Sequence, residues 1–422
     1  MQRVTLRFVI IGVLALTMLV PLMLVGGVAW ERQDYYEDAR AEVAEAWGGS
    51  QQLAGPFLLV DETYNCKEPG EDGKVRWVTC RKRVVFLPQS LDVQAEVSHQ
   101  FRRRAIYDVP VYQADVTLNG HFELPGPDLN MRLDLRTARL VFGVTHTQAL
   151  VKRPDLITNG EAVSFQATTG TDWLQGGVQT PVKVPDTREV SFSLDLSIKG
   201  TNTLMLSPIG DESTLEMNAT WPHPSFGGRY LPLQHDITSQ GFQASWSVHE
   251  LARDLPSSWR EDTREPRFGG VEVTLYEPAT DYRLVDRGIK YGILFISLTF
   301  VSFLCFEIGS GIRFHYVQYG VVGLGLTLFF LGVLSLSEHI PFSVAYTFAT
   351  TLIAGLISWY VWSITSAKRL AAYIAAIMGA LYGALYVLLT LEDYALLAGT
   401  AVLFLGLAAL MYSTRSLAAP QT

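Results

Sequence analysis

Charged side chains are scarce at both ends of this 422-residue chain. Residues 1–30 contain only two charged side chains, those of Arg3 and Arg7, and residues 291–422 contain only eight. Segments this apolar argue against a wholly water-soluble protein and indicate membrane-spanning helices. The middle, residues 31–290, holds 27 basic and 37 acidic residues, which gives a net charge of −10. An acidic middle argues against a nucleic-acid partner, because phosphates bind basic surfaces.

The sequence also lacks the short motifs that mark common catalytic sites. It contains no G-x-S-x-G elbow, H-E-x-x-H helix, phosphate-binding P-loop or C-x-x-C pair. His223, His235 and His249 are separated by 12 and 14 positions, and these spacings match no tight metal-ligand pattern. We therefore predict no catalytic residue, no metal site and no cofactor, and a protein that is not an enzyme.

Apolar runs long enough to cross a bilayer occur once near the start of the chain and repeatedly towards its end. A hydrocarbon core about 30 Å thick needs about 20 apolar residues of helix. The first run is longer than the apolar part of a secretory signal, so we interpret it as an uncleaved anchor. A cleaved signal is the alternative, because Gly27 and Ala29 have cleavage-like spacing. We predict six spans, at about 8–30, 291–308, 316–335, 341–363, 370–390 and 395–412.

Small residues recur every four positions in the span at 370–390. One such row consists of Ala371, Ala375, Gly379 and Gly383. Rows of small residues let helix backbones approach closely in lipid, so we predict that this span is a central packing helix. A groove that admits a substrate is the alternative.

The basic residues of the short loops predict the orientation of the spans. With six spans, one side of the membrane receives all six basic residues, and the opposite loops carry the acidic residues Glu338, Glu392 and Asp393. The basic side faces the cytoplasm. Both termini are therefore predicted to be cytoplasmic, and residues 31–290 to lie in the periplasm. The six basic residues are Arg3, Arg7, Arg313, Lys368, Arg369 and Arg415.

The middle of the chain is predicted to form a β-sandwich of two antiparallel sheets. Apolar and polar residues alternate between about 57 and 280, which is typical of strands with one buried face. Residues 31–47 contain no Gly or Pro and are predicted to continue the first span as a helix. Hairpin turns are predicted at "LNG" (118–120) and "IKG" (198–200). The alternating segments are "SLDVQAEVSHQF", "VYQADVTLNGHFEL", "NMRLDLRTARLVF", "EVSFSLDLSIKG" and "GGVEVTLYEP".

Three cysteines are present. Cys66 and Cys80 flank a short loop, and in an oxidising compartment we predict that they form a disulfide. Two free thiols are the alternative. Cys305 lies in an apolar span, where we expect it to fill space rather than to react.

The acidic turns contain the polar residues best suited to a site. Glu338 and His339 in one hairpin could converge with Glu392 and Asp393 in another at the outer membrane face. Two carboxylates near an imidazole can bind a cation or relay a proton. We favour the simpler interpretation that these residues cap helices at the water interface. Glu307 is expected to extend towards water or to pair with a nearby basic residue, Arg313.

The aromatic segment "WPHPSFGGRY" is the candidate partner surface of the β domain. Its candidate residues are Trp221, His223, Phe226 and Tyr230. Large aromatic side chains usually belong to a core, so we favour a structural plug in the sandwich over a binding surface.

Several segments carry a family resemblance, namely "KYGILFISLTFVSFLCFE", "VQYGVVGLGLTLFFLGVLSLSEHIPFSVAY", "ALYGALYVLLTLEDYALLAGT", "STRS", "AWGGSQQLAGP" and "WPHPSFGGRYLP" with "GFQASW". They resemble the CreD family of bacterial inner-membrane proteins. The resemblance implies an inner-membrane protein of a Gram-negative cell with a large periplasmic domain. It also implies an association with envelope integrity, colicin tolerance and a response linked to β-lactam exposure, and it supplies no catalytic residue. The family's polar positions correspond to Glu338, His339, Glu392 and Asp393 and, on the inner side, to His315, Gln318 and Tyr319; Tyr316 departs from the family's proline.

We therefore expect a non-enzymatic envelope protein. Its β domain would bind a periplasmic protein, a lipid or a cell-wall component, and its helices would anchor it in the lipid bilayer. One alternative is a transporter or channel-like bundle with the outer acidic cluster as its entry, and another is a membrane enzyme that uses Glu338, His339 and Asp393. The predicted domains are an anchor (1–30), a juxtamembrane helix and linker (31–56), a periplasmic β domain (57–286), a five-helix bundle (287–415) and a cytoplasmic tail (416–422).

Overall fold

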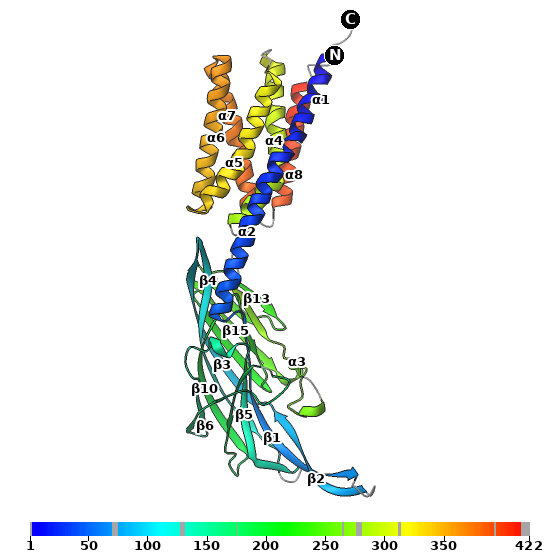
Figure 1. Ribbon diagram of the computed structural model, residues 1–422, viewed down its shortest axis with the longest axis vertical. Helices are drawn as coiled ribbons and strands as arrows, with labels where there is room; N and C mark the ends of the chain where they lie inside the picture. Colours follow the sequence, from blue (N-terminus) through cyan, green and yellow to red (C-terminus); the bar gives the residue numbers. More distant parts are fainter. Residues whose placement is uncertain are drawn as a thin grey trace. The chain divides into compact units, whose positions relative to one another are not determined.

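The chain folds into two compact units, which the computed structural model describes for most of their residues (Figure 1). The helical unit comprises Met1–Glu37 and Ala279–Thr422, and the β unit comprises Asp38–Pro278. The described residues are 2–69, 75–126, 131–174, 176–263, 266–275, 281–310, 314–391 and 394–414.

Long apolar helices make up the helical unit. Five of them are long and apolar enough to cross a membrane, and they contain residues 6–47, 282–307, 316–337, 342–365 and 371–390. A shorter apolar helix, Leu397–Tyr412, lies at the position of the sixth predicted span. The helices are α1 (Gln2–Thr17), α2 (Leu19–Trp47), α4 (Asp281–Ser310), α5 (Tyr316–Ser337), α6 (Phe342–Thr365), α7 (Lys368–Thr390) and α8 (Ala395–Thr414).

The first two helices are separated only by a break at Met18. Pro21 explains this position, because its ring would clash with the carbonyl of the residue four positions earlier, Thr17. From Leu19 the helix continues to Trp47, as predicted for residues 31–47. It ends at Gly48 and Gly49, whose positive φ angles of 124° and 66° favour glycine.

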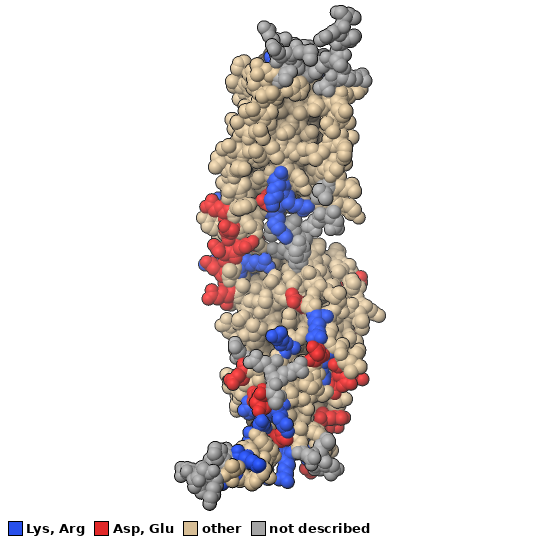
Figure 2. Space-filling view, turned by 90° about the vertical axis from the view of Figure 1, so that its right-hand side faces the viewer, with Lys and Arg blue, Asp and Glu red and all other residues tan. Residues whose placement is uncertain are grey.

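The outward side chains of the helical unit are apolar. Figure 2 shows a face of this unit that is almost free of charged side chains over most of its length. Helices that are apolar on both their inner and outer faces belong in lipid. In α5, for example, the exposed side chains include Val317, Val321, Leu324 and Leu328.

The prediction that the row of small residues in α7 packs against neighbouring helices is wrong at the two glycines of the row. Gly379 and Gly383 are exposed, and a Cβ added at either position would have no neighbour within 4 Å. The buried side of α7 instead carries large residues, among them Met378, Tyr382 and Leu385. This helix therefore packs on its neighbours α6 and α4 through bulky side chains, while Gly379 and Gly383 face outward.

Two sheets form the β unit, and one shared core of buried apolar residues fills it. Alternation predicted this arrangement: in β12, for example, every second side chain is buried. The nine-stranded sheet contains β1 (Gln51–Pro69), β2 (Val75–Phe86), β5 (Leu133–Val144), β8 (Gln166–Ala167), β9 (Gly177–Pro181), β11 (Thr203–Ser207), β13 (Pro224–Gly228), β16 (Ser258–Arg260) and β17 (Val271–Leu275). The eight-stranded sheet contains β3 (Ser90–Arg104), β4 (Tyr107–Glu123), β6 (Asp155–Thr158), β7 (Glu161–Val163), β10 (Glu189–Gly200), β12 (Glu212–Ala219), β14 (Gln234–Thr238) and β15 (Gly241–His249).

The prediction that both sheets are antiparallel throughout is wrong for two pairs of strands. β1 and β11 run parallel, and so do β3 and β12. In each pair the two strands are far apart in sequence, and parallel neighbours require such long connections. Alternation of side chains does not distinguish the two directions, because it is the same in both.

The hairpin predicted at "LNG" is also wrong. Gly120 lies inside β4, between Leu91 of β3 and Phe192 of β10. A Cβ at this position would overlap the backbone carbonyl oxygen of Ser90. The glycine therefore allows three strands to pack closely and does not mark a turn. The second predicted turn, "IKG", ends β10, and the next strand, β11, belongs to the other sheet.

The C-terminal end of α2 is fixed to the β unit. Trp47 donates its indole N–H to the backbone carbonyl of Tyr112, and the guanidinium of Arg102 lies 4.2 Å from the centre of its ring. Tyr112 is fully buried and donates its hydroxyl to the carbonyl of Thr203 at 2.8 Å. Burial raises the pKa of Tyr112 far above its usual value.

Candidate functional site

The predicted outer polar residues lie in the turn that joins α5 and α6. Glu338 follows α5 and forms an ion pair with Arg32 of α2, with 3.5 Å between Nε and Oε1. His339 is exposed in the same turn, and its backbone N–H donates to the carbonyl of Leu336. Glu392 and Asp393 lie outside the described residues. The structure thus brings Glu338 to a cation on another helix, which the sequence did not indicate.

A pocket of 280 Å³ lies between α2 and α4 of the helical unit. Trp30 donates its indole N–H to Asp286 at 3.1 Å, and Lys290 pairs with the same carboxylate one helical turn away, at 2.6 Å. The Trp30–Asp286 hydrogen bond connects the two helices beside the pocket. Its lining residues are Ala29, Trp30, Gln33, Asp34, Tyr282, Arg283 and Asp286.

The polar residues expected on the inner side cap the start of α5. His315 accepts a hydrogen bond from the backbone N–H of Val317, and Gln318 accepts one from the backbone N–H of His315. This reciprocal arrangement is a capping box, which satisfies donors at a helix start. The structure therefore gives His315 and Gln318 a local role in holding the helix terminus.

Glu307 lies in α4 with only 5% of its side chain exposed. It forms an ion pair with Arg7 of α1 and accepts a hydrogen bond from the hydroxyl of Tyr319 in α5, at 3.1 Å. The expectation that Glu307 extends to water is wrong, because the carboxylate is enclosed where three helices meet. Arg313, the other expected partner, lies outside the described residues.

Aromatic side chains fill the middle of the bundle. Tyr346 of α6 donates its hydroxyl to the backbone carbonyl of Tyr382 in α7 at 2.7 Å. The ring centres of Phe329 in α5 and Tyr382 lie 4.4 Å apart, with their planes tilted by 47°. The buried Tyr382 hydroxyl has no hydrogen-bond partner among the described residues. These contacts join α5, α6 and α7.

The four residues of the candidate partner surface of the β unit differ in their burial. Trp221 belongs to the core, and Phe226 and Tyr230 pack against it, while His223 is exposed. Trp221 donates its indole N–H to the carbonyl of His223, and Tyr230 donates its hydroxyl to the carbonyl of Ala252. These contacts agree with the structural plug that we favoured. A partner surface at this segment stays a prediction.

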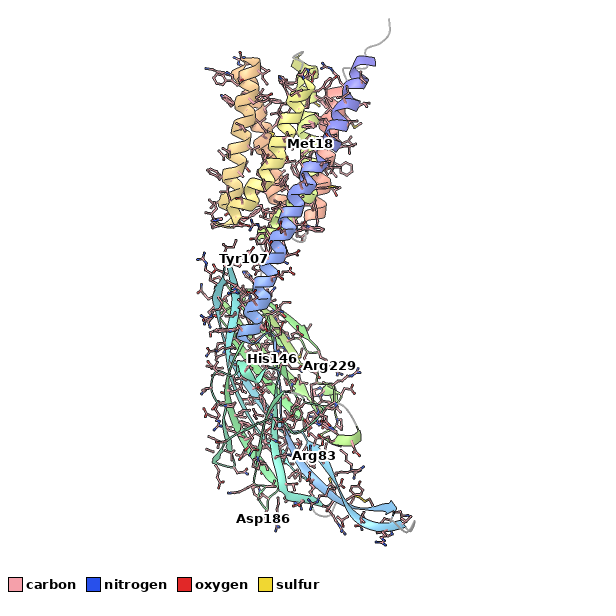
Figure 3. All side chains as sticks on the ribbon, in the orientation of Figure 1. Met18, Arg83, Tyr107, His146, Asp186 and Arg229 are labelled. Atoms are coloured by element: carbon pink, nitrogen blue, oxygen red, sulfur yellow. A yellow bond between two sulfur atoms is a disulfide. The ribbon has the colours of Figure 1, made fainter. Side chains whose placement is uncertain are left out.

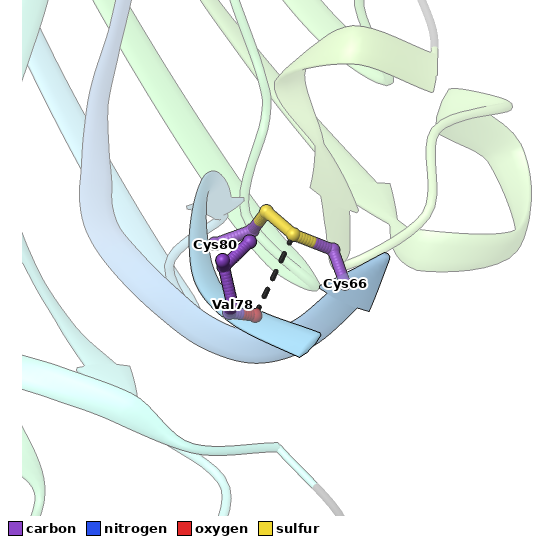
Figure 4. The surroundings of a disulfide bond; sticks show 3 residues. All are labelled: Cys66, Val78 and Cys80. Carbon is purple, nitrogen blue, oxygen red and sulfur yellow. Dashed lines mark hydrogen bonds between the residues drawn. A yellow bond between two sulfur atoms is a disulfide. The ribbon is translucent and has the colours of Figure 1, made fainter. Parts of the chain in front are cut away.

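A disulfide connects Cys66 of β1 to Cys80 of β2 (Figure 4). The two strands are paired in register from Leu58 to Pro69, so the bond joins strands that are already neighbours. At the base of this hairpin, the buried carboxylate of Glu62 binds the guanidinium of Arg260 through two hydrogen bonds, of 2.8 and 3.0 Å. Glu62 raises the pKa of Arg260.

A second ion pair holds the same hairpin. Arg83, labelled in Figure 3, lies 2.9 Å from Glu261 and donates to the carbonyl of Gly170. Arg83 thus attaches the hairpin to the segments that follow β16 and β8, and the Glu62–Arg260 pair attaches it to β16 itself. The arrangement stabilises the fold, and it does not bring an acid and a base together as a catalytic site would.

These features define an integral membrane protein with apolar helices and a large all-β unit. A protein-family model described as inner membrane protein CreD matches residues 3–418. Inner membrane protein CreD of Escherichia coli (strain K12) is 34% identical over 415 residues, which cover 95% of this chain and 90% of that protein. The chain belongs to the CreD family of inner membrane proteins.

Solved structures add no argument about function. A mutant M1 zinc metallopeptidase from Deinococcus radiodurans is 12% identical, with a TM-score of 0.24 over 44% of this chain and 42% of that chain. A substrate-bound form from the same organism is 9% identical, with a TM-score of 0.24 over 79% and 95% of the two chains. Scores this low establish neither a shared fold nor a shared activity.

Proposed function

We propose that this chain holds a partner-binding β unit on the periplasmic face of the bacterial inner membrane. Six spans anchor it, both termini lie in the cytoplasm, and the protein contributes to envelope integrity and the envelope stress response. The proposed partner is a periplasmic protein, a lipid or a cell-wall component. Colicin tolerance and a link to β-lactam exposure enter this proposal from the family resemblance.

The distribution of charge at the two ends of the helical unit supports the orientation. The start of α1 and the α6–α7 connection carry Arg7, Lys368 and Arg369 at one end (Figure 1). The α5–α6 turn at the other end carries Glu338. The chain enters the β unit from the end of α2 and leaves it before α4 begins, both away from the basic end. Basic loops remain in the cytoplasm, so the β unit belongs outside.

One observation carries the binding role, namely that the β unit exposes large apolar side chains on one short segment. Leu231 and Leu233 are 67% and 70% exposed, and Ile237 follows with 45%. Grouped exposed apolar residues mark sites where proteins bind partners. The core of the unit is filled by its own apolar side chains, so we assign the binding role to its surface.

Reporter fusions and co-purification test this proposal. We expect alkaline phosphatase to be active, and a cytoplasmic fluorescent protein to stay dark, when either is fused after His339. Fusions after Ser366 should give the opposite pair of signals. Full-length protein extracted directly into nanodiscs should retain a bound envelope component. Fluorescence after His339, or β units resistant to protease added to spheroplasts, would contradict the orientation, and nanodiscs without a bound component would contradict the binding role.

Transport is a second candidate, and the 280 Å³ pocket beside Asp34 and Asp286 is the observation that favours it. A cation entering from the outer side would meet these carboxylates and the Glu338–Arg32 pair. Transport predicts that Glu338→Gln abolishes ion flux into proteoliposomes, while the matched change Glu123→Gln in the β unit leaves it intact. Equal flux in both variants excludes this candidate.

A further inference from the structure

The two edges of the eight-stranded sheet differ from each other. Its last strand, β14, pairs with β15, and within the described strands it has no neighbour on its other side. All five residues of β14 are exposed. The outer side of such a strand presents backbone N–H and C=O groups that another chain can pair with.

Proteins protect sheet edges with charged residues or very short strands, and the opposite edge of this sheet shows both devices. There, β7 has only three residues, and its Glu161 forms an ion pair with Lys183 at 3.1 Å. β14 is longer, with five residues, and contains neither Lys nor Pro; its charged residue is Asp236. It includes the exposed Ile237 and follows the exposed Leu231 and Leu233. This edge is therefore open, and Leu233 and Ile237 give it exposed apolar side chains.

The two faces of β14 have different chemistry. Ile237 pairs with the buried Phe242 and lies on the core side, and Asp236 pairs with Gln243 on the opposite face. On that face, a pocket of 360 Å³ extends over β15, β12 and β3 and has Asp236 and Glu96 among its lining residues. No Lys or Arg occurs among the described residues that line it. Arg229, labelled in Figure 3, instead lies 3.8 Å from Asp254.

We propose that the free edge of β14 binds an extended, basic segment of a partner protein. The segment adds a strand to the sheet through backbone hydrogen bonds. Its apolar side chains contact Leu233 and Ile237, and its Lys or Arg side chains, which alternate with them, extend towards Asp236 and Glu96. The acidic pocket decides the charge of the partner, because two carboxylates without a cation attract one. This inference rests on the proposed partner-binding function and names its site.

A synthetic peptide tests the site without knowledge of the natural partner. The probe is fluorescently labelled Val-Lys-Val-Lys-Val-Lys-Val with blocked ends, titrated into the full-length protein in nanodiscs of neutral lipid. Fluorescence anisotropy reports binding. Two control peptides separate the contributions: one carries Glu in place of Lys, and one carries N-methyl groups on alternate valines, which remove backbone donors along one edge of the strand.

Variants with matched controls locate the binding. We expect Leu233→Asp and Asp236→Lys each to weaken binding of the probe about tenfold or more. The matched changes Leu251→Asp, at another exposed leucine, and Asp195→Lys, on a distant strand of the same sheet face, should leave the Kd unchanged. Circular dichroism checks that all four variants keep the β-sheet signal.

The results of these titrations distinguish a basic partner segment at the β14 edge from other occupants. Binding that is lost with the Glu peptide, with the N-methyl peptide and in both edge variants supports the proposal. Absence of binding, equal binding of the Glu peptide, or equal binding by the edge variants overturns it. A concentration-dependent dimer that blocks the probe also overturns it, because the occupant would then be a second copy.

If Leu233→Asp retains an envelope partner that wild type carries, the edge is excluded and the proposed function stands. If the probe binds as expected but wild type carries no partner, the proposed function fails and the edge stands.

Discussion

Arg7→Met should destabilise the helical unit more than any other substitution of a basic residue that we consider. The change removes the cation from Glu307, which keeps only the hydrogen bond from Tyr319 and remains 5% exposed. Breaking a buried ion pair by removing one partner costs about 3–5 kcal/mol. Glu307→Gln should cost only about 1 kcal/mol, because the amide can still accept a hydrogen bond. Arg7, with 27% of its side chain exposed, can then extend towards water.

The double variant distinguishes pairing from two independent effects. Combining Arg7→Met with Glu307→Gln removes both charges, so the unfolding free energy should recover most of the loss, with a coupling of about 2–3 kcal/mol. Pulse proteolysis of purified protein in mixed micelles of increasing SDS content measures these free energies. Lys368→Met, at an exposed basic residue of the same end, is the control and should change stability by less than about 0.5 kcal/mol. Additive effects of the two single changes would refute the reasoning.

Three further predictions concern the β unit. Tyr112→Phe should cost about 1–3 kcal/mol at neutral pH, because the carbonyl of Thr203 loses its donor. Burial raises the pKa of Tyr112, so the wild-type protein keeps this contribution to its unfolding free energy below pH of about 10 and loses it as the pH rises further. In urea unfolding between pH of about 9 and 11, the unfolding free energy of the variant should therefore fall less than that of the wild type. Replacing both Cys66 and Cys80 with Ser should lower the unfolding free energy by about 3 kcal/mol or less; trypsin cleavage within the hairpin should accelerate, and an unchanged cleavage rate would contradict this. Gly120→Ala should cost more than about 4 kcal/mol, because its methyl group would overlap a carbonyl of β3, and a melting temperature close to that of wild type would show that the strands can separate without cost.

The sequence predicted those parts of the fold that depend on local patterns. Uninterrupted apolar runs located the helices, and the predicted spans at 316–335 and 341–363 agree with α5 and α6 to within two residues at each end. Alternation located the strands, because a half-buried strand has the same period wherever it pairs. The short separation of Cys66 and Cys80 predicted their disulfide.

Features that depend on distant segments were not predictable from one sequence. Arg7 and Glu307 are 300 positions apart, and neither has a local pattern that indicates the other. Gly120 was mistaken for a turn because the same residue type serves turns and close strand packing. The sequence did contain an indication of the exposed apolar residues beside β14. Leu231 and Leu233 flank Pro232 in a polar segment, and both leucines are exposed in the structure.

The position of β1 in its sheet has a consequence for biosynthesis. Residues 53–60, which include Phe57, are almost completely buried between β2, β5 and β11, yet the ribosome makes them first. At about 5–20 residues per second, β11 follows roughly 8–30 s later. In that interval β2 is made first and β5 follows, so β11 is the last of the three partners of β1 to be made. The apolar residues of β1 therefore stay partly exposed in the nascent chain until β11 has been made.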